Sequence, residues 1–178
     1  GYGVKRGFDA YTESQVMQGS GLSSSAAFEV LLGNICNTFY AENQCSTEEI
    51  AEIGQFAENV YFRKPCGLMD QMASSVGGVV AIDFADAAAP QVEPVSFDFS
   101  TSGYALCIVD TGGNHADLTA EYAAIPEEMG AVAKYFGAQV LSEVPANQVM
   151  QAIPALRKAC GDRAVLRAIH FYREDRRA

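Results

Sequence analysis

The sequence predicts a protein of the α+β class with one domain or two small ones. Apolar residues recur at helical spacing in several segments, and apolar runs typical of strands lie between them. Glycine and proline residues mark most of the junctions. With 178 residues, of which 49% are hydrophobic, the chain can bury a sizeable core. Strands that alternate with helices along the chain therefore indicate a mixed fold.

The first half of the chain predicts a strand followed by two helices. Residues 7–14 read as the strand, and a helix is expected over residues 26–39. The apolar face of this helix would carry Ala27, Val30, Leu31, Ile35 and Phe39. Ser46 and Glu49 form a capping box that predicts a second helix. The expected apolar stripe of the second helix holds Ile50, Ile53, Ala57 and Val60 or Tyr61.

A short helix and a strand follow. Pro65 and Gly67 break the chain, and the next helix is short and carries Asp70 and Gln71. The apolar run at residues 79–84 predicts a strand, which begins after two consecutive glycines. These elements complete the first predicted domain.

A linker is expected next. Residues 85–94 are rich in alanine, proline and aspartate, so we expect two domains, over residues 1–90 and 91–178. A half-buried strand is predicted from the alternation of Val95, Phe97 and Phe99. Residues 104–109 predict a buried strand.

Two helices are expected in the last third of the chain. The first would present Leu118, Tyr122, Ile125, Met129, Val132 and Phe136, although Pro126 should break or restart it. The second spans residues 162–177, with Val165, Ile169 and Tyr172 on its apolar face. From Arg157 onward, seven basic residues stand against three acidic ones. We interpret these arginines as the solvated face of a helix, with a basic interaction patch as the alternative.

The composition excludes several classes of function. A net charge of −10 argues against nucleic acid as a partner, because that binding requires clustered Lys and Arg. The sequence has neither an apolar run long enough for a membrane span nor a visible signal peptide. Its five cysteines form no C-x-x-C pair, which favours reduced thiols and a cytoplasmic location. Only two histidines occur, so a histidine metal site is not expected.

The most informative motif is a run of small residues directly before a helix. Residues 19–27 read G-S-G-L-S-S-S-A-A. Glycines permit unusual backbone conformations, and the first turn of a helix offers free N–H groups and a positive dipole end to an anion. The motif is not a Walker loop, because no lysine follows the second glycine. It predicts a phosphate site, and ordinary capping and turn chemistry is the alternative.

Two later segments help to interpret the run of small residues at positions 19–27. P-C-G-L-M-D-Q occupies residues 65–71, and V-D-T-G-G-N-H-A-D-L-T-A-E-Y occupies residues 109–122. In this order, the three segments resemble the galactokinase branch of the superfamily of homoserine, mevalonate and phosphomevalonate kinases (GHMP kinases). The resemblance implies a two-lobed fold in which ATP, Mg²⁺ and a sugar bind between the lobes. It covers nearly the whole chain but only the middle of the family's length, so we expect an internal fragment that is inactive alone.

The resemblance also implies roles for individual residues. The phosphate loop would consist of Gly19, Ser20, Gly21, Leu22, Ser23, Ser24 and Ser25. Ser25 and Glu58 would hold Mg²⁺, Asp70 would be the catalytic aspartate, and Gly67, Asp70 and Tyr122 would bind the sugar. Periodicity places Glu58 on the flank of the apolar stripe, where a carboxylate can reach a cleft or water. Each of these residues has a structural alternative: Glu58 as a solvated helix residue, Asp70 as a helix-capping acid, and Tyr122 as a core side chain. Asn114 and His115 match a further loop of the family.

One departure leaves the substrate open. The family commonly carries two arginines after the tyrosine, whereas Ala123 to Pro126 follow Tyr122 here. We therefore expect a galactokinase, with a kinase for N-acetylgalactosamine or a related sugar as the first alternative. A non-catalytic sensor of the same fold is the second. The expected partners are ATP and a small sugar, without nucleic acid or membrane, and the sequence indicates no oligomeric state.

Overall fold

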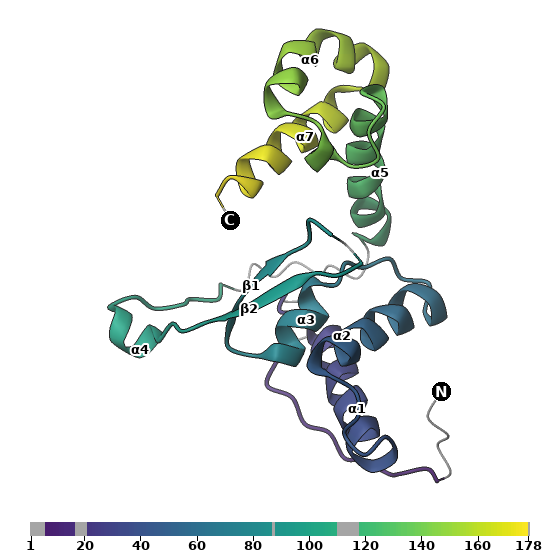
Figure 1. Cartoon of the computed structure of the whole chain (residues 1–178), viewed down its shortest axis with the longest axis vertical. Helices are drawn as coiled ribbons and strands as arrows, with labels where there is room; N and C mark the ends of the chain where they lie inside the picture. Colours follow the sequence, from purple (N-terminus) through teal and green to yellow (C-terminus); the bar gives the residue numbers. More distant parts are fainter. Residues whose placement is uncertain (1–5, 17–20, 87, 110–117, 178) are drawn as a thin grey trace. The chain divides into compact units, whose positions relative to one another are not determined.

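In the computed structural model, the chain divides into two compact units, at residues 1–116 and 117–178. The structure describes residues 6–16, 21–86, 88–109 and 118–177, and Figure 1 shows their helices and strands. The sequence placed the junction between lobes at residues 90 and 91, inside the first unit. That lobe boundary stays a prediction. No helix of the described residues is long and apolar enough to cross a membrane.

Helices dominate the first unit. They are α1 (Ser24–Tyr40), α2 (Thr47–Phe56), the π-helical turn η1 (Ala57–Tyr61) and α3 (Met69–Val76). The capping box is confirmed, because Ser46 and Glu49 exchange both of its hydrogen bonds. The predicted first helix is also confirmed, but it begins two residues earlier, at Ser24. Its first turn therefore consists of residues from the serine run.

The buried faces of α1 and α2 are narrower than the sequence predicted. Ala26, Val30 and Asn37 are the buried residues of α1, whereas Leu31 and Phe39 are exposed. In α2 the buried residues are Ile50, Ala51 and Gly54, and Ile53 is exposed. Close helix contacts at glycines explain why the buried faces differ from the predicted ones. A Cβ on Gly33 would lie 2.8 Å from Ile50 Cγ2, and one on Gly54 would lie 3.3 Å from Gln71 Cγ, so α1, α2 and α3 approach closely at the glycines.

A two-stranded antiparallel hairpin follows α3. Strand β1 (Val79–Asp83) agrees with the prediction, and it pairs with β2 (Gln91–Val95) in a register that places Val79 opposite Val95. The predicted linker at residues 85–94 was wrong at its end, because its last residues form β2. The predicted strand through Phe99 was also wrong beyond Val95. Asp98 accepts a hydrogen bond from the Ser100 N–H (2.8 Å) and so caps α4 (Phe99–Ser102) instead.

Two predicted strands do not form. Residues 7–14 and 104–109 are exposed and carry no strand in the described part of the chain. An apolar run becomes a strand only when a neighbour pairs with its backbone groups, and no described residue pairs with either segment. Composition alone cannot supply that partner.

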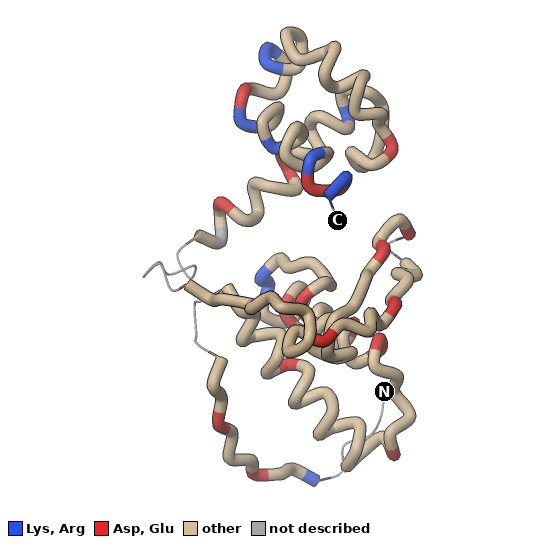
Figure 2. The backbone as a smooth tube through the Cα atoms, turned by 90° about the vertical axis from the view of Figure 1, so that its left-hand side faces the viewer, with Lys and Arg blue, Asp and Glu red and all other residues tan. Residues whose placement is uncertain are grey.

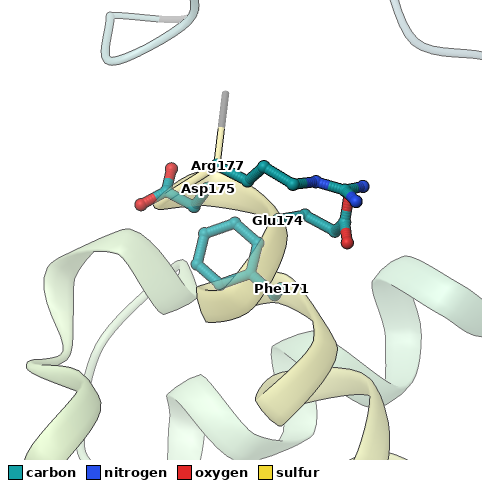
Figure 3. A pocket seen from close by; sticks show the side chains of 4 residues that line it. All are labelled: Phe171, Glu174, Asp175 and Arg177. Atoms are coloured by element: carbon teal, nitrogen blue, oxygen red, sulfur yellow. The ribbon is translucent and has the colours of Figure 1, made fainter.

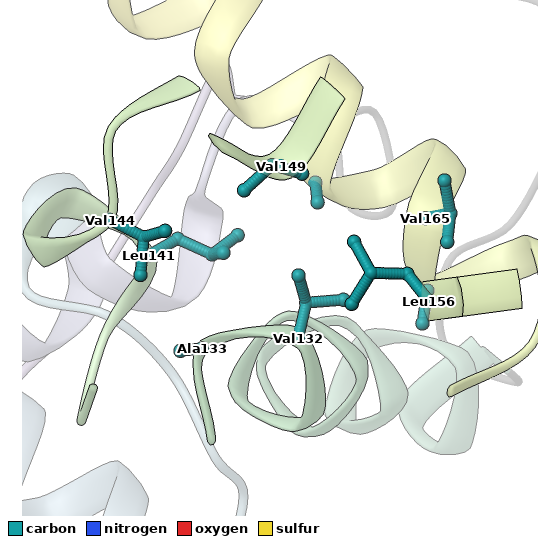
Figure 4. Packing of buried hydrophobic residues seen from close by; sticks show 9 residues of the cluster. Val132, Ala133, Leu141, Val144, Val149, Leu156 and Val165 are labelled. Carbon is teal, nitrogen blue, oxygen red and sulfur yellow. The ribbon is translucent and has the colours of Figure 1, made fainter. Parts of the chain in front are cut away.

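The second unit is wholly helical in its described residues. It consists of α5 (Thr119–Tyr135), the 3₁₀ turn η3 (Leu141–Glu143), α6 (Ala146–Cys160) and α7 (Asp162–Asp175). Figure 4 shows its apolar core between these helices. The buried residues of this core are Val132, Ala133, Leu141, Val144, Val149, Leu156, Ala164, Val165 and Ala168.

Two details of this unit correct the prediction. Pro126 does not break α5, which continues to Tyr135 although proline removes one helical hydrogen bond. Only the second half of the predicted apolar stripe is buried: Val132 has no exposed surface, whereas Leu118 and Tyr122 are exposed. The later residues pack on α6 and α7, which stabilises the helix beyond the proline.

The predicted last helix is confirmed as α7, with Val165 buried and Ile169 and Tyr172 packed against the core. Figure 2 shows basic residues on the C-terminal unit, whereas acidic ones predominate on the N-terminal unit. Arg163 and Arg167 both pair with Glu128 of α5. Part of the basic face therefore ties α7 to α5, in addition to facing solvent.

Candidate functional site

The N-terminus of α1 is arranged to leave its first N–H groups uncapped. Ser23 is the N-cap residue, and its backbone is left-handed (φ 55°, ψ 48°). Its side chain makes no capping hydrogen bond, and no acidic residue occurs in the first helical turn. Ser23 Oγ instead donates to Asp70 Oδ2 at 2.5 Å. The first N–H groups of α1 therefore lack a capping acceptor from Ser23, and the carboxylate that lies near this helix end is that of Asp70 from α3.

The residues before Ser23 form part of an irregular loop. Gly21 has φ 77°, a conformation that favours glycine, and Leu22 is exposed. Ser24 and Ser25 are the first two helical residues. Gly19 and Ser20, the other predicted phosphate-binding residues, lie outside the described residues.

Glu58 lies on the buried face of its helix, which corrects the prediction of a position on the flank. It follows Ala51 and Gly54 along the face that packs toward α1 and α3, and it is 5% exposed. The chain passes from α2 into a π-helical turn at this point, where the Phe62 N–H bonds to the Ala57 carbonyl. Such turns are frequent at functional sites, and here the change of pitch accompanies burial of a carboxylate.

Several donors surround the Glu58 carboxylate. Lys64 Nζ donates to Oε1 at 2.7 Å and Gln71 Nε2 to Oε2 at 3.2 Å. The Cys66 thiol and the Ser25 hydroxyl lie nearby and also act to lower the pKa of Glu58. Burial acts to raise the pKa of Glu58, but the hydrogen bonds and the charge of Lys64 outweigh it and lower that pKa below its ordinary value. Glu58 is therefore held as a carboxylate.

A second carboxylate, that of Glu29 in α1, belongs to the same cluster. The sequence patterns did not predict a role for this residue. Gln71 Nε2 donates to Glu29 Oε2 at 3.1 Å, so one amide group bridges Glu29 and Glu58. Burial raises the pKa of Glu29, and the neighbouring charge of Glu58 raises it further against the effect of Gln71. Helical spacing could have indicated this role, since Glu29 lies one helical turn beyond Ser25 and therefore on the same face of α1.

The loop between η1 and α3 is fixed by hydrogen bonds from side chains to its backbone. Asn59 clamps Cys66 in both directions: Oδ1 accepts from the Cys66 N–H (2.7 Å), and Nδ2 donates to the Cys66 carbonyl (3.2 Å). Gln55 adds a longer bond to the same carbonyl. Burial and the nearby Glu58 raise the pKa of the Cys66 thiol to about 12, so this cysteine is a structural thiol rather than a nucleophile.

The loop delivers Asp70 to the start of α3. Asp70 lies in the first turn of this helix, is exposed, and contacts Ser23 across 47 positions of sequence. Gly67 is exposed, and a Cβ added there would meet no atom within 4 Å. Among the predicted residues, Ser23 and Asp70 are in contact and Ser25 lies near Glu58, whereas Tyr122 belongs to the second unit. Asn114 and His115 lie outside the described residues.

A shallow pocket lies elsewhere, at the C-terminal end of α7. Figure 3 shows its lining residues, which are Phe171, Glu174, Asp175 and Arg177. All four come from the same helical end, and Arg177 pairs with Glu174. The pocket contains none of the residues that the sequence singled out, so the candidate site is the cluster at the N-terminus of α1.

The family follows from comparison with known proteins. Residues 1–78 match the GHMP kinases N terminal domain, which covers the serine loop, Glu58 and Asp70. This part of the chain is therefore similar to the N-terminal domain of the GHMP kinases. The predicted superfamily is confirmed, and so are the α+β class and the partial kinase fold.

Curated relatives extend the likeness beyond the GHMP kinase domain. A galactokinase of Actinobacillus pleuropneumoniae serotype 3 (strain JL03) is 33% identical over 173 residues, which are 97% of this chain and 44% of that protein. A galactokinase of Streptomyces coelicolor is 34% identical over 176 residues, or 96% of this chain and 43% of that protein. The chain thus spans less than half the length of these relatives. No solved structure matches.

The GHMP kinase domain offers a donor set that suits magnesium. Mg²⁺ usually takes one or two protein oxygens and completes its shell with phosphates and water. Glu58 provides an ionised carboxylate, and the hydroxyl of Ser25 lies near it. No group of three or more His, Cys, Asp and Glu side chains able to hold a metal occurs among the described residues.

Proposed function

We propose that the protein containing this chain transfers the γ-phosphoryl group of ATP to the anomeric hydroxyl of galactose. In this reaction the hydroxyl oxygen attacks the γ-phosphorus, the bond to the bridging oxygen of ADP breaks, and the hydroxyl proton is released. The galactokinases among the relatives support the substrate class. The GHMP kinase domain supports ATP as the phosphoryl donor.

One contact carries the proposal. Ser23, from the serine loop, donates to Asp70, from the P-C-G-L-M-D-Q segment, at 2.5 Å. With phosphate bound by the serine loop and the acceptor hydroxyl bound by Asp70, this contact would bring the two reacting groups together, as phosphoryl transfer requires. A capping role for Asp70 in α3 alone would not require this contact.

Each part of the candidate site would have its own role in the phosphoryl transfer. Free N–H groups at the start of α1 would bind phosphate oxygens, and Ser25 and Glu58 would hold Mg²⁺. The metal would neutralise charge on the phosphates. Asp70 would orient the sugar hydroxyl or accept its proton, and the loose transition state places little demand on its basicity.

The sugar would be held partly by residues outside the phosphate region. Gly67 would allow close approach at the loop before α3, and Tyr122 would hydrogen-bond the sugar. The five free thiols are compatible with a cytoplasmic location, which is part of the proposal.

Assays of the intact protein test the function. With ATP and Mg²⁺, we expect sugar-dependent ADP release with galactose, measured beside N-acetylgalactosamine. Asp70→Ala should lower the rate by about 10² or more, the scale of a positioned acid or base. A variant with the wild-type rate would remove Asp70 from the mechanism. Sugar binding without turnover would favour the sensor instead.

The isolated 178-residue chain provides a second comparison. Phosphoryl transfer requires several groups in one geometry, and loss of one positioned donor can lower the rate by about 10² to 10³. The chain spans less than half the length of its relatives, so we expect negligible activity from it alone. A rate within about tenfold of the intact protein would show that the site is assigned to the wrong residues.

A further inference from the structure

Lys64 occupies the position next to Glu58 where a cation would bind. Its Nζ lies 2.7 Å from Glu58 Oε1. The Glu58 side chain is 6% exposed, whereas that of Lys64 is 55% exposed. The carboxylate is therefore fixed inside the unit, and the ammonium group covers it from the solvent side.

Backbone contacts hold Lys64 in this position over Glu58. The Lys64 N–H donates to the Glu58 carbonyl at 2.9 Å, so main chain and side chain of Lys64 both contact Glu58. The preceding residue, Arg63, has φ 55°, a left-handed conformation that is uncommon outside glycine. Such strain persists where the surrounding structure enforces it, and here it returns the chain toward Glu58.

The neighbouring carboxylate explains why a cation is needed. Glu29 and Glu58 share the Nε2 group of Gln71, with distances of 3.1 and 3.2 Å. Two carboxylates that accept from the same amide nitrogen lie close enough to repel each other, and one neutral amide cannot compensate both charges. Among the described residues, Lys64 is the cation paired with this cluster.

We propose that Lys64 is a built-in counter-ion of the metal site, which pairs with Glu58 in the metal-free protein and is displaced when a nucleotide brings a divalent cation. This inference rests on the proposed metal role of Glu58. Its consequence is that Lys64 weakens metal binding and at the same time supports binding of the metal-free nucleotide.

Displacement follows from the geometry of the two cations. Mg²⁺ binds oxygen ligands at about 2.0–2.1 Å and repels a neighbouring ammonium group. The two therefore cannot share Oε1 of Glu58. Because the Lys64 side chain is half exposed, its ammonium can rotate into water while the backbone bond to Glu58 stays in place.

The test measures binding, not catalysis. Calorimetry on the intact protein gives the dissociation constant of a non-hydrolysable ATP analogue without metal and that of its magnesium complex. The ratio of the first constant to the second reports how much the metal contributes. We compare wild type with Lys64→Met, Lys64→Gln and Glu58→Gln, and with Arg63→Met as the matched control. Arg63 is the adjacent residue and makes no ion pair in the described part of the chain, so its loss removes an equal charge.

The inference predicts that Lys64→Met raises this ratio by roughly fivefold or more over Arg63→Met, because an ion pair that competes with the metal is lost. Lys64→Gln gives the same result if the methionine variant fails to fold. Equal ratios for the Lys64 and Arg63 variants, with a lowered ratio for Glu58→Gln, would overturn the counter-ion role and keep the metal assignment. An unchanged ratio for Glu58→Gln would overturn both.

Discussion

The two units of this chain bury different kinds of side chain. The core of the second unit is a continuous cluster of aliphatic residues between α5, η3, α6 and α7 (Figure 4). In the first unit the helices meet at glycines, and Asn37, Glu58 and Gln71 are buried there. Among the described residues, these are the only buried polar or charged ones. A polar interior contributes less to stability than an apolar one, but it can fix the position of chemical groups.

This difference indicates that the second unit holds an apolar core that stabilises the fold, whereas the first unit holds the candidate site. Burial of an aliphatic side chain contributes about 1.5–3 kcal/mol wherever the packing is close. A buried carboxylate contributes favourably only while its partners remain in place. The change in the free energy of unfolding caused by a substitution should therefore differ between the two units, both in its size and in its dependence on pH.

The largest expected effect is in the apolar core. Leu156 has no exposed surface, so Leu156→Ala should leave a cavity and lower the free energy of unfolding of the second unit by about 2–5 kcal/mol. Amide hydrogen exchange measures this unit by unit. Faster exchange should be confined to α5, α6 and α7, and an equal increase in α1 to α3 would show that the units do not behave separately.

A smaller effect with a pH signature is expected at Glu58. Glu58→Gln removes a carboxylate that accepts several hydrogen bonds, which should lower the free energy of unfolding by about 1–3 kcal/mol at pH 7. The pKa of Glu58 is lowered from 4.5, so its contribution is complete above that pH and is lost as the pH falls through the folded-state pKa. Denaturant titrations at several pH values should show wild type and variant converging in acid.

Glu29→Gln is the matched control for this prediction. The pKa of Glu29 is raised from 4.5, so its ionised form is disfavoured in the folded protein above that range. Removing the charge should stabilise the protein at neutral pH, with the advantage lost in acid. A loss of stability at neutral pH for both variants would contradict the raised pKa of Glu29.

A still smaller effect is expected at a polar anchor of the second unit. The hydroxyl of Tyr172 lies 2.9 Å from the Leu141 carbonyl and 2.7 Å from that of Val144, and so ties α7 to the turn before α6. Tyr172→Phe should lower the free energy of unfolding by about 1 kcal/mol and leave the packing of the ring unchanged. Chemical denaturation measures the loss, and a loss as large as that of Leu156→Ala would contradict an apolar basis for this core.

The smallest effect on stability is expected at Gly67. Space is open around this residue and its backbone is not left-handed, so Gly67→Ala should change the free energy of unfolding by less than about 0.5 kcal/mol. If Gly67 contacts the sugar, the same variant should raise the KM for the sugar. An unchanged KM would remove Gly67 from the proposed sugar site.

The sequence by itself determined the local elements and the chemistry of the motifs. Ser46 and Glu49 marked the start of α2, because a capping box depends only on residues three positions apart. Helical spacing identified α1 and α7, and three short motifs indicated the kinase superfamily. All of these signals are local in the chain.

Tertiary structure decided which faces are buried and which distant groups meet. Gly33 and Gly54 set the helix contacts that place Glu58 inside the first unit, whereas periodicity placed it on a flank. The pairing of β2 with β1, and the absence of a partner for residues 104–109 in the described chain, likewise depend on non-local hydrogen bonds. The Ser23 contact with Asp70 spans 47 positions, and no local rule predicts it, because the energy of a long-range contact depends on the packing of everything between.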